Sequence, residues 1–340
     1  MFKNPFTSFF FFSVLLMCMA QSGTAQGLRF RFTQPKMGSP FHLVLYAGDS
    51  AAAKQKANEA FALIDSLNKI FSDYDSTSEL MQLSATGGKD SFVPVSTLLY
   101  DVLVQSKRAA EKSGGTFDIT IGPLSRLWRQ ARRQKDFPSA RAVQAAKAKT
   151  GMHHIIIDTA TKKVKLLQAG MQLDLGGIGK GYIAQAVVDY LKGAGITQVL
   201  ADAGGDIACG DAPPGKKGWT VAINIPGEKN KLLPKPLLLA NSAVATSGDV
   251  YQYTEHKGKR YGHIIDPRTG YGVTFQRNVT VIAPNGATAD WLATACSILP
   301  VGKAKKLARK KGAALLITQM KKEKLRSRST QTFDQFWEKE

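Results

Sequence analysis

The sequence predicts an α+β fold with two lobes around a shared cleft. Helical and extended segments are interspersed along the chain, and two pairs of extended segments have the spacing of antiparallel hairpins. With 340 residues and a hydrophobic content of 44%, the chain can bury the core of one large or two modest domains. No internal repeat or long low-complexity linker divides it, so we expect one domain over residues 26–340.

Residues 1–25 have the pattern of a secretory signal peptide. Lys3 precedes an apolar run over 9–19, and small residues follow, with cleavage expected after Ala20 or Ala25. The run is short for a membrane span. The cysteine within it does not follow the small residue that normally precedes a lipidated cysteine, so lipidation is the weaker alternative. We therefore expect this segment to be removed and the mature chain to be exported to a periplasm-like compartment.

The two cysteines of the mature chain, Cys209 and Cys296, leave two interpretations open. An oxidising compartment permits a disulfide between them. Cysteines this far apart are also common as separate small core residues, and nothing in the sequence decides between the two.

The chain is strongly basic, with a formal net charge of +20. Most basic residues are spread out, but one dense zone runs from Lys303 to Arg328. No zinc-ligand spacing, aromatic RNA-binding motif or helix-turn-helix pattern accompanies it, so we do not expect a nucleic-acid partner. A solvated basic face is the simplest interpretation, and the alternative is attraction of an anionic substrate or a membrane surface.

Local signals place the elements of the first half. Asp49 or Ser50 can cap one helix, and Ser96 can cap another that ends at Gly114-Gly115. The ranges expected here are a turn-rich entry at 34–40, a strand at 41–46, a helix at 51–70, an irregular stretch at 71–80 with a helix start near Ser78, helices at 97–112 and 135–150, and a hairpin of strands at 154–158 and 163–167.

The second half alternates strands with three helices. The expected ranges are strands at 199–203, 218–225, 243–249, 279–283 and 313–317, a proline-interrupted link or edge strand at 232–239, a hairpin over 251–262, and helices at 183–191, 287–295 and 303–311.

A glycine-rich segment, Leu173-Asp174-Leu175-Gly176-Gly177-Ile178-Gly179-Lys180-Gly181, joins an apolar strand end to an amphipathic helix. Such turns let backbone groups approach a phosphate closely, and a helix N-terminus favours anions. Lys180 adds a positive charge at the same place. The glycine spacing matches neither a Walker loop nor a dinucleotide fingerprint, and a purely structural turn is the alternative.

Asp290 and Thr294 are four residues apart in the expected helix at 287–295, so their oxygens lie on one face. A carboxylate and a hydroxyl placed in this way can hold Mg²⁺, which prefers oxygen ligands and keeps waters and substrate phosphates in its shell. The same pair is also common on an ordinary solvated helix face.

The order of eight motifs resembles the ApbE family, the FAD:protein FMN transferases, over nearly the whole chain after the signal segment. In chain order the motifs are Met37-Gly38-Ser39, Tyr74 with Ser78-Glu79, Thr116-Phe117-Asp118 with Gly122-Pro123-Leu124, Asp174 to Gly181, Gly204-Gly205-Asp206, Thr246-Ser247-Gly248-Asp249, His263 to Gly270, and Ala289-Asp290 through Thr294.

This resemblance implies a T-fold-like core that binds FAD and Mg²⁺ and moves FMN from FAD onto a Thr or Ser hydroxyl of a partner protein, releasing AMP. By position, the metal ligands would be the Gly177 carbonyl, the Asp290 carboxylate and the Thr294 hydroxyl. The implied FAD contacts are Met37, Tyr74, Thr116, Phe117, Asp118, Asp174, Lys180 and Ile264.

The acceptor hydroxyl must lose a proton, and His263 is the first candidate for the base because an unperturbed histidine titrates near neutrality. Asp118 is the second candidate. The chain holds no Asp-Gly-x-x-Gly-x-Thr acceptor pattern, so the modified protein would be another one. An FAD pyrophosphatase and a non-enzymatic exported flavin-binding protein stay as alternatives.

The chain departs from the family's pattern at three places. Trp291 and Gln185 stand where a small residue and an aspartate are usual, and Gly177 and Gly179 replace alanines, which should make the loop more flexible. None of these changes removes an implied metal ligand.

Overall fold

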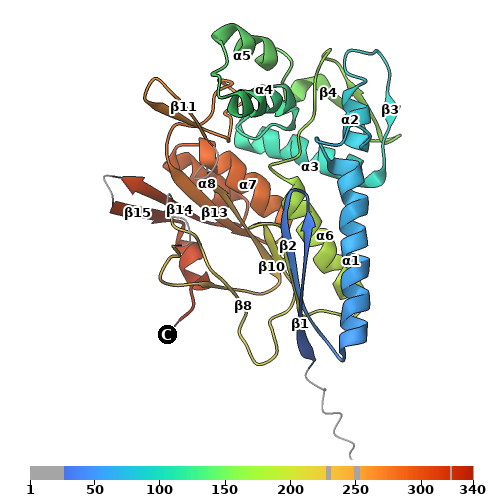
Figure 1. Ribbon diagram of the computed structural model, residues 1–340, viewed down its shortest axis with the longest axis vertical. Helices are drawn as coiled ribbons and strands as arrows, with labels where there is room; N and C mark the ends of the chain where they lie inside the picture. The colour runs from blue at the N-terminus through green and yellow to red at the C-terminus, as the bar shows by residue number, and fades with distance from the viewer. Residues whose placement is uncertain (1–26, 227–230, 249–252, 322–323, 340) are drawn as a thin grey trace, which may run out of the picture.

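The computed structural model describes residues 27–226, 231–248, 253–321 and 324–339, and one large antiparallel sheet organises them (Figure 1). Each strand of this sheet is antiparallel to its neighbours. Its eight strands, in spatial order, are β1 (Leu28–Lys36), β2 (Ser39–Ala47), β6 (Val199–Asp202), β7 (Ile207–Cys209), β10 (Ser242–Gly248), β13 (Arg277–Ala283), β14 (Ala314–Lys321) and β15 (Lys324–Ser329).

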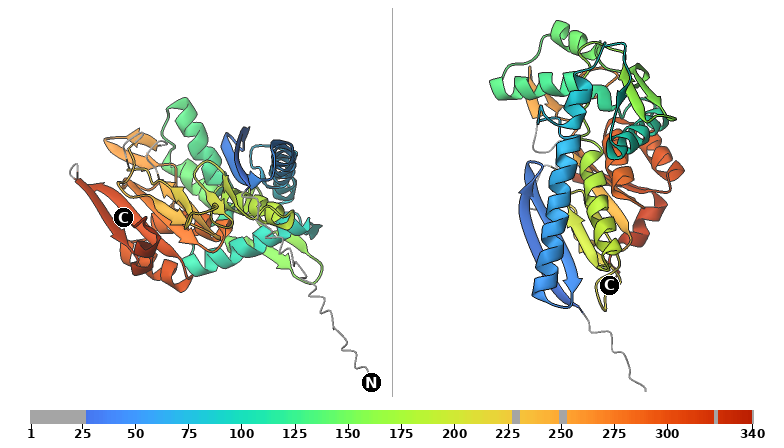
Figure 2. Two further views of the ribbon diagram at one scale, coloured as in Figure 1. Left: turned by 90° about the horizontal axis from the view of Figure 1, so that it is seen from below. Right: turned by 90° about the vertical axis from the view of Figure 1, so that its right-hand side faces the viewer.

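Helices cover one face of this sheet. The long helix α1 (Ser50–Phe71) lies beside α6 (Gly179–Gly193) over β2 and β6, while α7 (Gly286–Ile298) packs on β10 and β13 (Figures 1 and 2). Helix α8 (Val301–Lys310) follows α7 and contacts β14. Every residue of β13 is buried, because the sheet is covered on both faces at its centre.

A smaller layer covers part of the opposite face. It consists of the two-stranded sheet β8 (Trp219–Val221) and β9 (Leu237–Leu239) with the 3₁₀ helix η3 (Gln331–Phe336). Side chains from alternate positions of the large sheet, such as Val44 and Ile282, pack there against Trp219 and Phe333. The α+β fold class predicted from the sequence is therefore confirmed.

The remaining elements gather at one end of the molecule, at the top of Figure 1, where α2, α3, α4, α5, β3, β4 and β11 are labelled. They are α2 (Glu79–Ser84), β3 (Val93–Pro94), α3 (Thr97–Ser113), η1 (Ile119–Ile121), α4 (Gly122–Gln134), α5 (Ala140–Lys147), η2 (Met152–His154), the strands β4 (Ile155–Asp158) and β5 (Lys163–Leu166), and the hairpin β11 (Tyr253–His256) with β12 (Lys259–Gly262). The division into two lobes stays a prediction.

Local capping chemistry accounts for the helix boundaries that the sequence predicts. Asp49 accepts a hydrogen bond from the Ala52 amide at 2.8 Å and starts α1, and Ser78 and Ser96 start α2 and α3 in the same way. Gly114 ends α3 in the left-handed conformation, with φ 65°.

Three expectations are corrected, and two elements, α4 and β15, were not predicted. The segment at 34–40 belongs to a hairpin, because β1 precedes β2 and alternates exposed arginines with inward phenylalanines. The helix expected at 135–150 forms only over 140–147, and a helix that the sequence reading missed, α4, precedes it and ends at Lys135, with φ 55°. Leu173 to Leu175 form no strand, and β15 was not predicted.

Cys209 and Cys296 are both buried and free, and they lie in different core clusters. The interpretation as separate core residues is therefore the correct one. Of the helices in the described ranges, none combines the length and apolarity that crossing a bilayer requires.

Candidate active site

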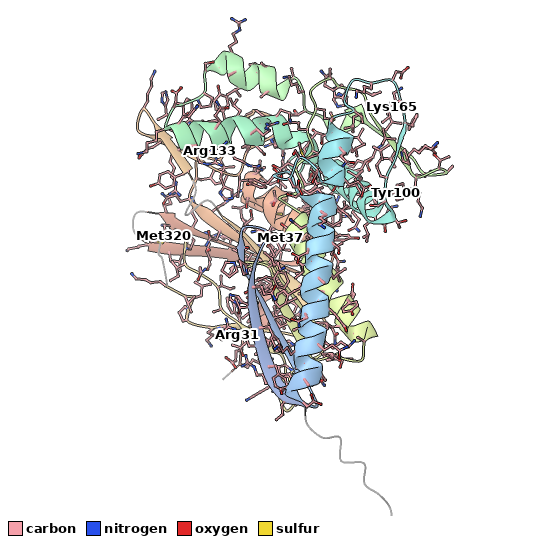
Figure 3. All side chains as sticks on the ribbon, turned by 45° about the vertical axis from the view of Figure 1, so that its right-hand side comes forward. Arg31, Met37, Tyr100, Arg133, Lys165 and Met320 are labelled. Carbon is pink, nitrogen blue, oxygen red and sulfur yellow. The ribbon has the colours of Figure 1, made fainter. Side chains whose placement is uncertain are left out.

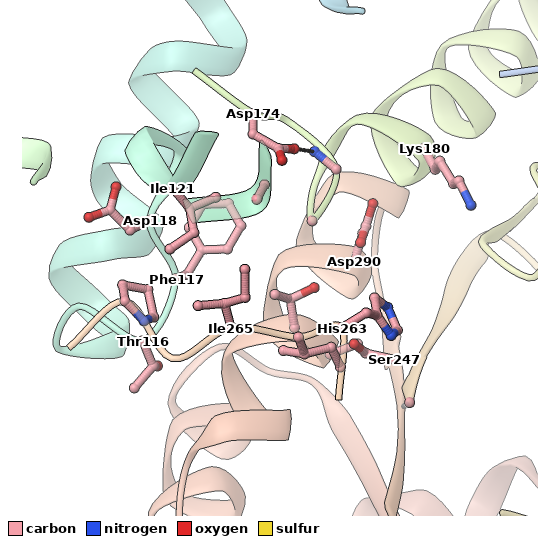
Figure 4. Close-up of a pocket in the computed structure, with 18 of the residues that line it drawn as sticks. Thr116, Phe117, Asp118, Ile121, Asp174, Lys180, Ser247, His263, Ile265 and Asp290 are labelled. Carbon is pink, nitrogen blue, oxygen red and sulfur yellow. Dashed lines mark hydrogen bonds between the residues drawn. The ribbon is translucent and has the colours of Figure 1, made fainter. Parts of the chain in front are cut away.

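A cleft with a volume of about 310 Å³ lies where the helical end of the molecule meets the first turn of α6 and the middle of α7. The structure brings eleven of the predicted site residues to its wall: Tyr74, Thr116, Phe117, Asp118, Asp174, Gly177, Lys180, His263, Ile264, Asp290 and Thr294. Figure 4 shows several of these side chains converging from separate elements.

Met37 is the predicted contact that the structure does not bring to this wall. It occupies the turn between β1 and β2 with φ 51°, and its side chain packs at the edge of the main core (Figure 3). Asp249, from another of the quoted motifs, lies outside the described residues, as does the segment 1–25.

Helices α6 and α7 each cap the other's N-terminus. The Gly181 amide near the start of α6 donates to Asp290 Oδ2 on α7 at 3.0 Å, and the Gly286 amide at the start of α7 donates to Gln185 Oε1 on α6 at 3.1 Å. Between these two bonds the backbones touch, because a Cβ placed on Gly181 would lie 2.2 Å from the Gly286 carbonyl oxygen. The glycines of this segment therefore serve close helix packing.

The N-terminus of α6 lies at the cleft, whereas α7 lines the cleft through Asp290, Ala293 and Thr294, beyond its first turn. The partial positive charge of the α6 N-terminus favours a bound anion. Lys180, in the first turn of α6, lines the cleft beside it. This arrangement suits a pyrophosphate.

The Asp290 carboxylate is 5% exposed, and only its Oδ2 takes part in a hydrogen bond among the described residues. Its Oδ1 therefore stays available. Gly177 is next to Thr294, since a Cβ at Gly177 would lie 3.0 Å from Thr294 Oγ1. One carboxylate, one hydroxyl and one carbonyl make a hard oxygen donor set that fits Mg²⁺ when waters and phosphate oxygens complete it.

The electrostatics of this end also favour a cation. Burial, followed by the nearby charge of Asp206, raises the pKa of Asp290 well above its usual range, although the Gly181 amide and Lys180 oppose the shift. Burial also raises the pKa of Asp206 to about 7, with Lys180 lowering it and Asp202 raising it. A bound cation would relieve the repulsion between these two carboxylates. Asp206 is thus a cleft residue that the sequence analysis did not assign to the site.

At the other end of the cleft, Arg129 joins three side chains. Its guanidinium contacts Asp73 Oδ2 at 2.6 Å and Asp174 Oδ2 at 2.9 Å, and it lies 4.4 Å from the centre of the Tyr74 ring. Asp174 Oδ1 accepts from the Gly176 amide at 2.8 Å, drawn in Figure 4. Burial, and then Asp174, raises the pKa of Asp73 to about 6 against the effect of Arg129. Arg129 thereby fastens the exposed Tyr74 to the glycine segment.

Arg129 belongs to a face of α4 that the sequence analysis missed. Ile121, Ser125, Arg129 and Arg132 recur at helical spacing and all line the cleft. Pro123 at the start of the helix was the available signal, because proline is common in the first turn of a helix. Of the side chains described, none forms an ion pair or hydrogen bond with Arg132, whose pKa burial and the neighbouring Arg129 both lower.

The two candidate bases differ in their surroundings. His263 directly follows β12 and lines the cleft with Asp290. Asp118 is engaged in capping η1, accepting from the Thr120 amide at 2.8 Å and hydroxyl at 2.6 Å, and its carboxylate points away from Asp290 in Figure 4. Burial raises the pKa of Asp118, and the bonds from Thr120 oppose this. The geometry therefore favours His263.

Two of the residues that depart from the family's pattern, Trp291 and Gln185, have structural roles. Trp291 is 6% exposed and packs behind Phe117, with ring centres 6.1 Å apart, so it supports the cleft wall without lining it. Gln185 supplies the cap of α7 described above.

Comparison with solved structures gives the class of protein. The fold is similar to the flavinyl transferase ApbE of Pseudomonas stutzeri in its apo form, with a TM-score of 0.80, 30% identity, and coverage of 92% of this chain and 98% of that one. It is also similar to the flavin transferase ApbE from Vibrio cholerae, with a TM-score of 0.82, 26% identity, and coverage of 91% and 99%.

Comparison of sequences gives the family. The model of the ApbE family matches residues 37–317. A protein named FAD:protein FMN transferase from Klebsiella pneumoniae (strain 342) is 34% identical over 256 residues, which are 75% of this chain and 77% of that relative. One of the same name from Escherichia coli (strain K12) is 31% identical over 271 residues, 78% and 76% of the two chains. This chain belongs to the ApbE family, and the resemblance in motif order is confirmed.

Proposed function

We propose that this protein is a Mg²⁺-dependent transferase that moves FMN from FAD onto a Thr or Ser hydroxyl of a partner protein and releases AMP. The observation that carries the proposal is the convergence of the α6 N-terminus, Lys180 and the residues Gly177, Asp290 and Thr294 on one cleft. The names of the relatives support the same activity.

In the proposed reaction the acceptor oxygen bonds to the phosphorus that carries the riboflavin part, and the bond from this phosphorus to the AMP oxygen breaks. His263 takes the proton of the acceptor hydroxyl, and AMP leaves with the bonding electron pair. Lys180 and the N-terminus of α6 stabilise the negative charge on the pyrophosphate oxygens, since phosphoryl transfer depends mainly on positioning and charge neutralisation. Mg²⁺ held by Gly177, Asp290 and Thr294 would supply Lewis-acid polarisation of these oxygens.

The aromatic end of the cleft suits a flat ring. Tyr74 is 79% exposed and rests on Arg129, so one of its faces is available for stacking. We assign Thr116, Phe117, Asp118, Asp174 and Ile264 to the same FAD-binding wall.

The deciding experiment combines the mature protein, FAD, Mg²⁺ and an extract of the host's cell envelope. Transfer predicts a fluorescent protein band in a denaturing gel and an equal amount of free AMP. AMP without a labelled protein would support the pyrophosphatase alternative, and neither product would support a flavin-binding protein. The labelled band identifies the acceptor for later kinetics.

We also propose export with removal of the signal segment and a location in the periplasm. Mass spectrometry of the native protein should find its N-terminus at Gln21 or Gln26, and an acylated Cys18 would contradict this. The basic zone on α8 and β15 is proposed to associate with anionic membrane surfaces, which co-sedimentation with phosphatidylglycerol vesicles would test.

A further inference from the structure

A second hollow, the basic groove, lies on the face of the large sheet opposite α1. Its volume is about 870 Å³, and it runs between β1, β2, β6 and β7 on one side and the loop before β8 on the other. Phe30 and Phe32 pack toward the main core that α1 also enters, so the alternating Arg29 and Arg31 face the groove. The side chains that define the groove are Arg29, Arg31, His42, Tyr46, Asp202, Ile207, Lys216, Lys217, Trp219, Glu338 and Lys339.

The groove carries an excess of positive charge, most of which has no partner among the residues that the structure describes. Five of its lining side chains are cationic and two are carboxylates. One of the carboxylates, Asp202, already accepts from the Gly205 amide at 2.7 Å. Arg31 reaches only His42, at 3.4 Å. Within the described ranges, the charged groups of the other four cations form no hydrogen bond or ion pair: Arg29, Lys216, Lys217 and Lys339.

This pattern differs from the charges in the cleft. There Arg129 is fixed between two carboxylates, and Lys180 lies near Asp206 and Asp290. Cations that are held by internal carboxylates serve the architecture, whereas unpaired cations around a hollow are available to an external anion. Tyr46 and Trp219, with ring centres 6.0 Å apart, add an aromatic wall that the bond from Trp219 Nε1 to the Asp211 carbonyl holds in place at 2.9 Å.

The groove and the cleft lie on opposite faces of the large sheet and approach each other at the hairpin of β6 and β7. Asp202 and Ile207 line the groove, while Asp206, between them in sequence, lines the cleft. A bond from the Ala203 amide to the Asp206 carbonyl at 2.9 Å keeps the turn tight. A protein seated in the groove would therefore have its adjoining part at the cleft.

We propose that the basic groove docks an acidic segment of the acceptor protein. This rests on the proposed function, which requires a second protein to present a hydroxyl at the cleft. The concave shape, walled by β8, fits a chain segment, whereas a planar bilayer would meet a convex surface such as the basic face of α8 more easily. Complementary charges at such a site accelerate encounter and fix orientation.

The first test measures binding without any transfer chemistry. Calorimetry should detect an oligoglutamate peptide binding to the wild type, with affinity that falls as salt rises, because exposed charge pairs are screened. Lys216→Glu/Lys217→Glu and Arg29→Glu/Arg31→Glu should abolish it. The matched control, Lys306→Glu/Lys310→Glu, makes the same change of net charge on exposed positions of α8 and should bind as the wild type does.

The second test uses the acceptor identified by flavin labelling. The groove variants should raise the KM for the intact acceptor about tenfold and leave the KM for FAD and kcat unchanged, because charges outside the cleft affect encounter and docking. A short peptide that carries the acceptor hydroxyl without the acidic segment should not distinguish the variants from the wild type.

Several results would overturn the proposal. They are an unchanged KM for the intact acceptor, an equal rise in the α8 control, or wild-type peptide affinity in the groove variants. Loss of binding to phosphatidylglycerol–phosphatidylcholine vesicles with an unchanged acceptor KM would assign the groove to lipid instead. If the wild type labels no protein at all, the proposed function fails, and the peptide titration still decides whether the groove binds acidic chains.

Discussion

The two ends of the cleft are built in opposite ways. At the phosphate end, formed by Gly177, Lys180, Asp290 and Thr294, two helices touch through their backbones and the key carboxylate is buried. At the arginine end, formed by Tyr74, Asp73, Arg129 and Asp174, side-chain ion pairs hold an exposed ring in place. The difference shows where the geometry is fixed by the backbone and where it depends on adjustable side chains.

The largest effect is expected from the ligands at the phosphate end. Asp290→Asn keeps an oxygen that can accept from the Gly181 amide but removes the charge, so the fold should persist while AMP release falls by about a thousandfold or more. Thr294→Val should cause a similar loss. Measurement of AMP against Mg²⁺ concentration checks this, and wild-type activity at low Mg²⁺ in either variant would contradict the assignment.

His263→Ala should reduce transfer by about a hundredfold to ten-thousandfold, which is typical of a lost general base, with little change in FAD affinity. The rise of the rate with pH that a histidine base produces should disappear with it. A loss of FAD binding and of transfer by the same small factor would show that His263 only binds or supports the substrate. The base role would then pass to Asp118.

Gly181→Ala tests the backbone contact directly. The new Cβ would lie 2.2 Å from the Gly286 carbonyl oxygen, so the helices must separate, at a cost of about 1–3 kcal/mol of unfolding free energy. Gly179→Ala is the matched control, because its Cβ would meet only Leu175 Cβ at 3.6 Å. Denaturant unfolding of both variants measures the difference, and equal stabilities would show that the phosphate end is not tightly packed.

The smallest effect is expected at the arginine end. Arg129→Ala releases Tyr74 and should raise the KM for FAD about three- to tenfold with kcat nearly retained, as expected when an interaction acts equally on the ground and transition states. Arg126→Ala, on an exposed position of the same helix, is the control. A kcat loss as large as that of Asp290→Asn would remove the distinction between the two ends.

Local chemistry predicted much of the fold and part of the site. The helix boundaries could be predicted because each capping residue acts within a few positions of itself. These residues are Asp49, Ser78 and Ser96 at helix starts and Gly114 at a helix end. The spacing of Asp290 and Thr294 likewise placed both on one helix face. Eleven of the predicted residues meet at one cleft, mainly because the motif order of a known family carried information that single motifs do not.

The rest depends on contacts between distant segments. Arg129 pairs with Asp174, 45 residues later, and no local pattern marks such a partner. Helix α4 was missed because a Gly-Pro pair such as Gly122-Pro123 is compatible with a turn as well as with a helix start. The burial of Leu124 and Trp128 against distant segments stabilises the helix. The packing role of Gly181 could not be predicted from the sequence either. Position 181 requires a glycine because the backbone of Gly286 approaches it closely, and that contact is seen only in the fold.

The mutual capping of α6 and α7 has a consequence for the order of assembly during folding. Gly181 and Asp290 are separated by 109 positions, and neither helix N-terminus is complete without the other. Until α7 docks, the proposed site lacks Asp290 and Thr294, so we expect affinity for FAD to arise only at that step. Flavin binding can thus serve as a late marker of native structure, and a ligand that stabilises the docked pair would also slow unfolding of the finished molecule.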